Sequence, residues 1–583
     1  MDAATRIGQL LAGFGVDHVF GVVGSGNFHV TNALVAAGAR FVPAAHEAGA
    51  ATTADAYARV SGKVGVVSVH QGPGVTNAMT GIAEAAKSRT PMIVLAPEAT
   101  NPRSNFFIDL AGVAGAVGAH FHRVVTGSVT SDVARAWELA TTGLGGTVVL
   151  GMPLEVQAAR VDAADLVDPT PPDPLEQALR QAHAASGNPE HAVVAPGQDA
   201  AYFSEAENAR VERLAEVLAA ARRPVFIAGR GAARVPWDGT RDALMRLARD
   251  CGALLATSAA AKGLFAGFRW NLDVSGGFAS PLAAELIGAA DVIVAWGSTL
   301  NMWTTRHGQL LPQGATVVRV DHDPAALDQP LIRPVADRFE VRGEVRHVAA
   351  AVHHCLIRDG RVPDRHPWRE EVGERIAAGV RWRDVAYQDE STATTIDART
   401  LSIAFDDMLP AERLVAVDSG NFMGYPSMFL TVPDASGFCF TQAYQSVGLG
   451  LASAVGAALA RPDRLTVAAL GDGGFLMSVA ELTTVARLGL PMLVVVYDDA
   501  AYGAEVHHFG PDGHVLDTVR FPDPPIASIA EGFGCVGVTV RGVGDLGPVR
   551  DWLAGPRERP LVVDAKVAAE RGSWWLEEAF RGH

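Results

Sequence analysis

The sequence is poor in cysteine and in charged residues. Charged residues make up 19% of the chain, whereas 49% of the residues are hydrophobic, which predicts a globular protein with sizeable cores. The cysteines are scattered and match no metal-binding spacing. Such cysteines are typical of reduced core residues in a cytoplasmic protein, so we expect that compartment. There are four: Cys251, Cys355, Cys439 and Cys535.

Positive charge and long apolar runs are also scarce. The 64 acidic residues outnumber the 48 lysines and arginines, and the net charge of −16 argues against nucleic acid as a partner. No apolar stretch is long enough to span a membrane, and the N-terminus lacks the basic, apolar and small-residue pattern of a signal peptide. We therefore expect neither membrane association nor secretion.

Length and periodicity predict three units. A chain of 583 residues is too long for one core. Apolar runs of strand length alternate with helical patterns, which predicts an α/β protein with three doubly wound parallel-sheet domains. The predicted parts are an N-terminal domain (1–165), a linker rich in Pro, Asp and Ala with a short helix near 175–185 (166–208), a central domain (209–355), a charged helical linker (356–395), a third domain (396–568) and a tail (569–583). The tail is amphipathic, and it either packs on the surface or closes over a site as a lid.

The most informative stretch lies in the third unit, where a glycine turn and a helix join two apolar runs. The first run, 465–470, leads into Gly471-Asp472-Gly473-Gly474, and the second, 492–497, leads into Asp498 and Asp499. Glycines at the carboxyl end of a parallel strand let backbone amides approach a phosphate. Aspartates at the ends of two neighbouring strands offer the oxygen ligands that suit Mg²⁺. The alternative is an ordinary turn with two solvated aspartates.

This stretch resembles the diphosphate-binding motif of thiamine diphosphate (ThDP) enzymes. Two further motifs, His46-Glu47-Ala-Gly-Ala and His70-Gln71-Gly-Pro-Gly, make the chain similar to the acetolactate synthase and 2-oxoacid decarboxylase group, which includes the pyruvate and benzoylformate decarboxylases. The resemblance covers nearly the whole chain except roughly residues 175–205. It implies ThDP and Mg²⁺ as cofactors and the three domains as pyrimidine-binding, central and diphosphate-binding.

The resemblance also implies roles for residues of the third unit. The metal ligands would be the side chains of Asp472 and Asp499 and the carbonyl of Ala501. Asp499 stands where the family usually has Asn, which adds a negative charge to the metal site. The residues implied to contact the cofactor are Gly74, Ser419, Gly420, Asn421, Gly471, Gly473, Gly474, Tyr502 and Gly503. For the turn that holds Ser419, the alternative is a solvated loop.

The segment 445–450 matches the part of the family that lies under the cofactor's aminopyrimidine ring. The backbone at Gln445 would accept a hydrogen bond from the exocyclic amine. At Val447 the family has a bulkier apolar residue, usually Met, Leu or Ile, that wedges the two cofactor rings into a bent shape. The smaller Val447 implies that the rings are held less firmly.

Glu47 matches the glutamate that hydrogen-bonds the aminopyrimidine nitrogen in this family, where it helps the cofactor lose the proton from its thiazolium carbon. A glutamate in an apolar environment has a raised pKa and can share a proton near neutral pH. The alternative is a glutamate that merely starts a helix, where its charge is favourable. Within the overall pattern we favour the catalytic role.

The expected substrate side of the site has two further catalytic candidates. His70 occupies the position of a catalytic histidine in some decarboxylases, and an imidazole titrates near neutrality and can relay protons. Packing is the alternative for His70. Glu505 follows the metal motif as a catalytic glutamate does in pyruvate decarboxylases. The pocket itself would be formed by Ser25, Gln71, Phe106 and Phe107, of which the two phenylalanines fit a core role equally well.

The resemblance predicts a ThDP- and Mg²⁺-dependent, acetolactate synthase-like enzyme that decarboxylates a 2-oxo acid and then protonates or ligates the enamine. The alternative is a 2-hydroxyacyl-CoA lyase or oxalyl-CoA decarboxylase-like enzyme. A catalytically silent regulatory homologue is a third reading, against which Glu47, Asp472 and Asp499 together argue. We expect a homodimer or homotetramer with active sites between chains.

The sequence leaves open whether the central domain binds a nucleotide. Gly229-Arg230-Gly231 follows a strand and could cradle the phosphates of FAD or ADP, although a helix-opening turn is the commoner explanation. Residues 300–303 lack the acidic residues of FAD-binding members, so the sequence lends FAD no support. The first turn, Val22-Val23-Gly24, also departs from true acetolactate synthases.

Overall fold

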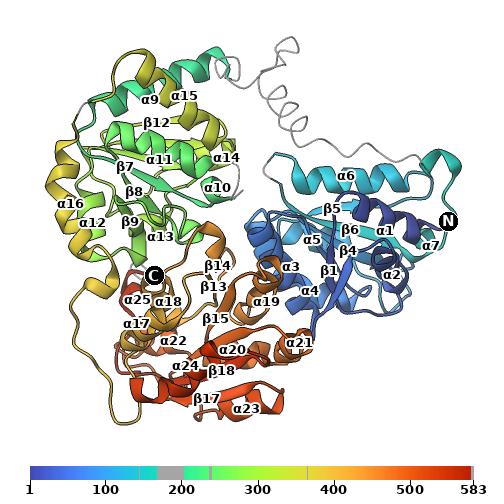
Figure 1. Ribbon diagram of the computed structural model, residues 1–583. Coiled ribbons are helices and arrows are strands. Elements are labelled where there is room, and N and C mark those ends of the chain that lie inside the picture. Colours follow the sequence, from blue (N-terminus) through green and yellow to red (C-terminus); the bar gives the residue numbers. More distant parts are fainter. Residues whose placement is uncertain (144, 167–202, 235–238, 364, 580–583) are drawn as a thin grey trace.

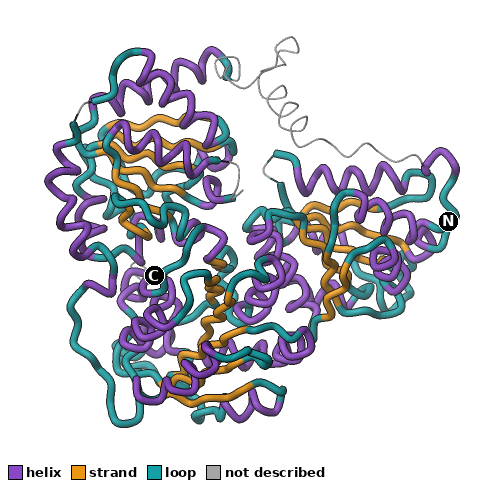
Figure 2. Tube along the Cα trace, viewed as in Figure 1, coloured by secondary structure: helices purple, strands orange, loops and turns teal. Residues whose placement is uncertain are grey.

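The computed structural model describes residues 1–143, 145–166, 203–234, 239–363 and 365–579, and it has three units, each built on a six-stranded parallel sheet (Figures 1 and 2). This confirms the predicted fold class. Most of the predicted linker 166–208, including the helix expected near 175–185, lies outside the described residues. Among those described, no helix combines the length and apolar character that crossing a membrane requires.

The first unit has the strand order β2-β1-β3-β4-β6-β5. Its central strands are buried on both faces, as expected for a parallel sheet covered by helices. The strands are β1 (His18–Gly21), β2 (Arg40–Pro43), β3 (Gly65–Ser68), β4 (Met92–Glu98), β5 (His120–Arg123) and β6 (Thr147–Pro153). The helices are α1 (Ala3–Gly13), α2 (Phe28–Ala36), α3 (Glu47–Ser61), α4 (Pro73–Lys87), α5 (Leu110–Ala116), α6 (Val129–Thr141) and α7 (Leu154–Gln157).

The second unit has the order β12-β11-β10-β7-β8-β9. Its strands are β7 (Pro224–Ala228), β8 (Leu254–Thr257), β9 (Asn271–Val274), β10 (Val292–Trp296), β11 (Thr316–Asp321) and β12 (Asp337–Arg342). Its helices are α9 (Glu205–Ala220), α10 (Arg230–Ala233), α11 (Thr240–Cys251), α12 (Pro281–Gly288), α13 (Met302–Thr305), α14 (Pro324–Asp328) and α15 (Val345–Arg358). The next helix, α16 (Pro367–Gly379), packs Trp368, Val372 and Ile376 into the core of this unit.

The third unit has the order β14-β13-β15-β16-β18-β17. Its strands are β13 (Arg413–Val417), β14 (Phe438–Phe440), β15 (Leu465–Gly471), β16 (Met492–Asp498), β17 (Val536–Val540) and β18 (Leu561–Lys566). Its helices are α17 (Ala398–Met408), α18 (Gly424–Phe429), α19 (Gly450–Ala460), α20 (Asp472–Ser478), α21 (Leu482–Leu488), α22 (Gly503–Phe509), α23 (Ile526–Gly532), α24 (Gly547–Ala554) and α25 (Trp574–Ala579). Separate apolar clusters cover the two faces of the sheet.

The first and third units meet through α3 and α19, which lie side by side (Figure 1). The hydroxyl of Thr53 on α3 donates to the carbonyl of Ala452 on α19 over 3.1 Å. A Cβ at Gly456 would lie 2.2 Å from the Thr53 carbonyl, so only glycine permits this approach of the two helices. The helix that begins at Glu47 is therefore fixed against the third unit of the same chain.

Each sheet has a reversal of strand order beside the first strand of its unit, and open α/β sheets bind ligands at the carboxyl ends of the strands where this happens. The reversal lies between β1 and β3 in the first unit, between β7 and β10 in the second, and between β13 and β15 in the third. The turns with Ser25 and His70 flank the first crevice. Those with Asn421 and Asp472 flank the third.

Candidate active site

A buried and a half-buried aspartate lie at neighbouring strand ends in the third unit. Asp472 follows β15 and Asp499 follows β16, and Gly471 pairs with Tyr497 in the parallel register of these strands. Asp472 is buried; its Oδ1 accepts from the Gly473 N–H at 2.7 Å and its Oδ2 from the Ala501 N–H at 3.2 Å. The structure thus brings together the three residues predicted to hold a metal.

Neither of these two carboxylates forms an ion pair with a described residue. Burial raises the pKa of both Asp472 and Asp499 far above the ordinary aspartate range, and the charges of Asp499 and Asp498 add to the shift at Asp472. No three His, Cys, Asp or Glu side chains in the described ranges could hold a metal ion by themselves. Mg²⁺ commonly binds through one or two carboxylates and completes its shell with water and phosphate oxygens, so the pair fits Mg²⁺ bound to a diphosphate.

The third carboxylate of this group, Asp498, has a cation of its own. Its Oδ2 lies 2.5 Å from the Nζ of Lys566, which ends β18 and also pairs with Asp523 and Asp564. Asp498 is therefore tied to Lys566, and Asp499 is left for a metal. Sequence reasoning missed Lys566, whose only signal is a lysine at the end of an apolar strand.

Three glycines hold the backbone of this site close to its side chains. A Cβ at Gly474 would lie 2.4 Å from Oδ2 of Asp418, and one at Gly503 would lie 2.2 Å from Oδ2 of Asp499. A Cβ at Gly473 would lie 2.6 Å from the ring of Tyr502. The open backbone left by these glycines suits a diphosphate, as the sequence predicts.

Asp418 organises the segment predicted to lie under the aminopyrimidine. Its carboxylate accepts from the N–H groups of Ser419, Gly448 and Leu449 at 2.8 to 3.1 Å. Burial raises the pKa of Asp418 to about 6, although these donors favour its charged form. Gln445 in this segment has a φ of +58°, which a non-glycine residue rarely adopts. Such strain is common at functional sites, where the surrounding structure holds it in place. Asp418 is a further residue that sequence reasoning did not select, although it directly follows a strand.

The side chain of Val447 borders the same turn. Its Cγ1 would lie 3.3 Å from a Cβ at Gly474. The predicted wedge residue therefore adjoins the predicted diphosphate turn.

A second cluster forms in the crevice of the first unit. The Nε2 atom of His70 lies 3.5 Å from Oγ of Ser25, and its ring lies 5.3 Å from that of Phe106. The side-chain carbonyl of Gln71 is buried against Gly26 and has no hydrogen-bond partner in the described parts of the chain. The predicted pocket residues Ser25, Gln71 and Phe106 thus gather with His70, and Phe106 and Phe107 are equally exposed.

Two asparagines complete this crevice and were not predicted. Asn27 is buried; its Oδ1 accepts from the Gly24 N–H at 2.8 Å, and its Nδ2 donates to the Val22 carbonyl at 3.1 Å, which fixes the first turn. Asn77 on α4 donates to Oε2 of Glu47 over 3.1 Å. Gly74 lies beneath His70, whose Cβ is 3.1 Å from a Cβ built at that glycine.

The carboxylate of Glu481 in the third unit bonds to the backbone of the first unit, within one chain. Glu481, between α20 and α21, is buried and accepts from the N–H groups of Ala45 and His46, just before α3 begins at Glu47, at 3.1 to 3.2 Å. In the described residues, the hydrogen bonds of Glu47 and His70 stay inside the first unit. Glu505 is exposed at the start of α22.

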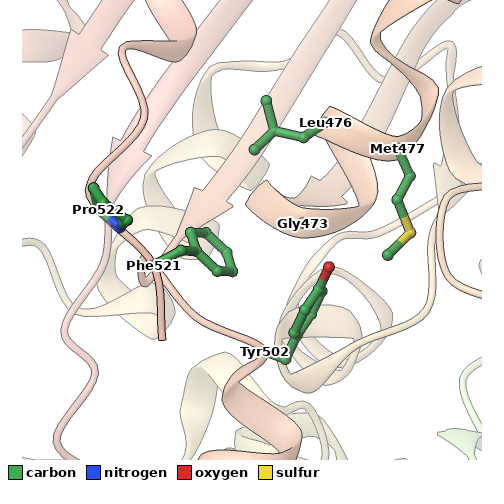
Figure 3. A pocket seen from close by; sticks show the side chains of 6 residues that line it. All are labelled: Gly473, Leu476, Met477, Tyr502, Phe521 and Pro522. Atoms are coloured by element: carbon green, nitrogen blue, oxygen red, sulfur yellow. The ribbon is translucent and has the colours of Figure 1, made fainter. Parts of the chain in front are cut away.

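A cavity of about 450 Å³ adjoins the metal site (Figure 3). Gly473 belongs both to the wall of this cavity and to the glycine turn, and the neighbouring Tyr502 also lines the cavity. The other lining residues are apolar: Leu476, Met477, Phe521 and Pro522. A ligand at the glycine turn would therefore have apolar surface beside it.

The turn Gly229-Arg230-Gly231 in the second unit has a packing explanation. A Cβ at Gly229 would lie 2.3 Å from the Gly297 carbonyl, and one at Gly231 would lie 2.8 Å from its Cα. Both glycines are required because two loops meet there. They give no independent support to FAD or ADP.

Sequence comparisons match all three units. The family "Thiamine pyrophosphate enzyme" matches with its N-terminal TPP binding domain at residues 1–116, its central domain at 211–352 and its C-terminal TPP binding domain at 418–565. The first and last of these contain the two crevices described above.

Curated relatives match over most of their length. A probable 2-ketoarginine decarboxylase of Pseudomonas aeruginosa is 30% identical over 86% of this chain and 83% of its own. A sulfoacetaldehyde acetyltransferase of Alcaligenes xylosoxydans is 27% identical (92% and 87%), and acetolactate synthase isozyme 2 large subunit of Escherichia coli is 26% identical (86% and 84%). The structure and these matches together show that the chain belongs to the thiamine diphosphate-dependent enzymes.

Proposed function

We propose that this protein is a ThDP- and Mg²⁺-dependent enzyme that decarboxylates a 2-oxo acid and either releases an aldehyde or joins the remaining fragment to a second carbonyl. The observation that carries the proposal is the pair of carboxylates at Asp472 and Asp499, which lie beside a glycine-lined turn and form no ion pair with any described residue. A divalent cation that bridges to a diphosphate would neutralise both. The three relatives named above have decarboxylase, synthase or acetyltransferase names, which fits this reaction class.

In this proposal the third unit binds the cofactor. Asp472, Asp499 and the Ala501 carbonyl hold Mg²⁺. Backbone and side-chain groups at Ser419, Gly420, Asn421, Gly471, Gly473, Gly474, Tyr502 and Gly503 hold the diphosphate. Gln445 and Val447 support the rings, and the strained backbone at Gln445 supports such a binding role. When bound, ThDP supplies the nucleophilic carbon and the electron sink.

The first unit handles protons in this proposal. Glu47 shares a proton with the cofactor's ring nitrogen, and Asn77 orients its carboxylate through the 3.1 Å hydrogen bond. His70 moves protons at the reacting carbon, and Ser25 orients its Nε2 atom. Gln71 and Phe106 border the substrate, and Glu505 approaches from the third unit.

The proposed active sites lie between two copies of the chain, in a homodimer or a dimer of dimers. Large apolar side chains are exposed around both half-sites, which supports a covering second copy. Met477 is 58% exposed and Tyr444 is 47% exposed. The others are Phe106, Phe107 and Tyr502.

The proposal is tested by CO₂ release from a panel of 2-oxo acids with ThDP and Mg²⁺, followed by product identification. A free aldehyde identifies a decarboxylase, and acetolactate from pyruvate identifies a synthase. Binding of ThDP without CO₂ release from any acid contradicts the proposed reaction and directs the search to 2-hydroxyacyl-CoA substrates. A protein that does not bind ThDP would be a silent homologue.

A further inference from the structure

The C-terminal segment 572–576 is docked against Asn421, a residue of the proposed diphosphate site. The backbone N–H of Ser573 donates to the Asn421 Oδ1 at 3.1 Å, and the Ser573 hydroxyl lies 2.9 Å from the same oxygen. The same hydroxyl lies 2.7 Å from the Asn421 carbonyl, which also accepts from the indole N–H of Trp575 at 3.0 Å. Ser573 and Trp575 thus both form hydrogen bonds with Asn421.

These contacts fix which way the carboxamide of Asn421 points. Because the backbone N–H of Ser573 donates to Oδ1 and its hydroxyl lies within hydrogen-bond distance of the same oxygen, the amide Nδ2 is turned to the other side, where it lies 3.5 Å from Oδ2 of Asp499. Asp499 is one of the proposed metal ligands. Ser573 therefore affects the proposed metal site indirectly, because it orients the Asn421 carboxamide, which contacts Asp499.

The docked segment is well buried. Ser573 is 2% exposed and Trp575 is 6% exposed. A Cβ at Gly424 would lie 2.0 Å from the Trp575 ring, so the indole rests directly on the backbone of α18. The neighbouring Trp574 packs on Trp382 and under the guanidinium of Arg306, which places α25 between the second and third units (Figure 1).

We propose that Ser573 is a positioning residue of the cofactor site and that docking of segment 572–576 is thermodynamically coupled to binding of ThDP and Mg²⁺. This inference rests on the proposed function, since it assigns Asn421 to the diphosphate site. Coupling is reciprocal: if the docked segment strengthens cofactor binding by some factor, the cofactor strengthens docking by the same factor. The tail is then part of the binding site rather than a surface feature.

The first test measures ThDP affinity by calorimetry at saturating Mg²⁺. Ser573→Ala removes the hydroxyl, and we expect about tenfold weaker binding, the usual consequence of losing a buried hydrogen bond. The kcat at saturating cofactor should stay near that of the wild type. Ser573→Thr, which keeps a hydroxyl, should restore most of the affinity. Glu570→Gln, an exposed change in the same stretch, is the matched control.

A double-mutant cycle asks whether Ser573 acts through Asn421. In an Asn421→Ala background, Ser573→Ala should weaken ThDP binding by less than about twofold further. A full additional loss would show that Ser573 acts elsewhere and would overturn the positioning role.

The second test uses the wild-type chain and does not depend on a variant folding. The side chain of Arg571 is 79% exposed, so trypsin cleavage after it reports release of the adjacent segment. ThDP with Mg²⁺ should slow this cleavage about tenfold, and Ser573→Ala should reduce the protection. Equal cleavage with and without bound cofactor contradicts the coupling alone. A wild-type chain that binds no ThDP overturns the proposed function as well.

Discussion

At the scale of single residues, charge placement decides the chemistry. Asp472, Asp498 and Asp499 are close in space, and within the described ranges only Asp498 pairs with a cation, Lys566. Glu47 is half-buried at the start of α3 and is held by Asn77. The role proposed for each carboxylate therefore depends on its immediate partner: a cation for Asp498 and a neutral hydrogen-bond donor for Glu47.

Glu47→Gln should lower kcat at least about a hundredfold, because the amide cannot share a proton with the cofactor as a carboxylic acid does. Affinity for ThDP should change only a few-fold, since most cofactor contacts lie in the third unit. Steady-state kinetics and calorimetry measure the two effects. Glu531→Gln, on the exposed side of α23, is the control, and near-normal turnover by Glu47→Gln would refute the catalytic role.

The aspartate pair predicts a pH effect on stability without metal. Burial raises the folded-state pKa of both Asp472 and Asp499, so the folded chain holds protons that the unfolded chain has lost. The stability of the metal-free protein should therefore fall as pH rises above the ordinary aspartate range. Mg²⁺ with ThDP should raise the unfolding temperature more at about pH 8 than at about pH 5.

The variant Asp499→Asn tests whether the two neighbouring carboxylates cause this loss of stability at high pH. Removing one of two like buried charges should raise the unfolding temperature of the metal-free protein near pH 8 and reduce the stabilisation by Mg²⁺ with ThDP. Thermal unfolding with and without Mg²⁺ checks both. A variant that is less stable than wild type at every pH, with unchanged response to Mg²⁺, would argue against an uncompensated pair.

At the scale of elements, the orientation of α3 depends on the third unit. Glu481 receives the free N–H groups just before this helix, and a Cβ at Gly49 would lie 2.0 Å from its Oε1. The helix that carries Glu47 is thus positioned by a residue more than four hundred positions away in the chain.

Glu481→Ala should destabilise the apoprotein by about 1 kcal/mol, because two partly buried N–H groups lose their acceptor. It should also lower kcat, since the start of α3 is no longer fixed. Glu481→Gln keeps an acceptor and should recover part of both losses. Denaturant unfolding and kinetics are the measurements, and an unchanged kcat with lowered stability would limit Glu481 to a structural role.

At the scale of the whole molecule, two half-sites lie in different units and expose apolar side chains. We expect sedimentation to give at least twice the mass of one chain, and activity to fall on dilution below the dissociation constant of the dimer. Met477→Lys should weaken association, because it places charge in the proposed interface. A fully active single chain would contradict sites formed between two copies.

Much of the fold follows from local pattern. Apolar runs identified strands such as β15 and β16, whose residues are buried on both faces. The edge strands β5, β9 and β12 lack such apolar runs, because they carry polar and partly exposed residues. The domain boundaries stay predictions.

The sequence by itself determined the fold class, the family and the residues of the glycine turn, because periodicity and turn chemistry are encoded by residues close together in the chain. Only the tertiary structure decided that Lys566 neutralises Asp498, that Glu481 holds the start of α3 and that Ser573 orients Asn421. Each of these is a polar pair whose members lie far apart in sequence, and neither member signals its partner before the chain folds.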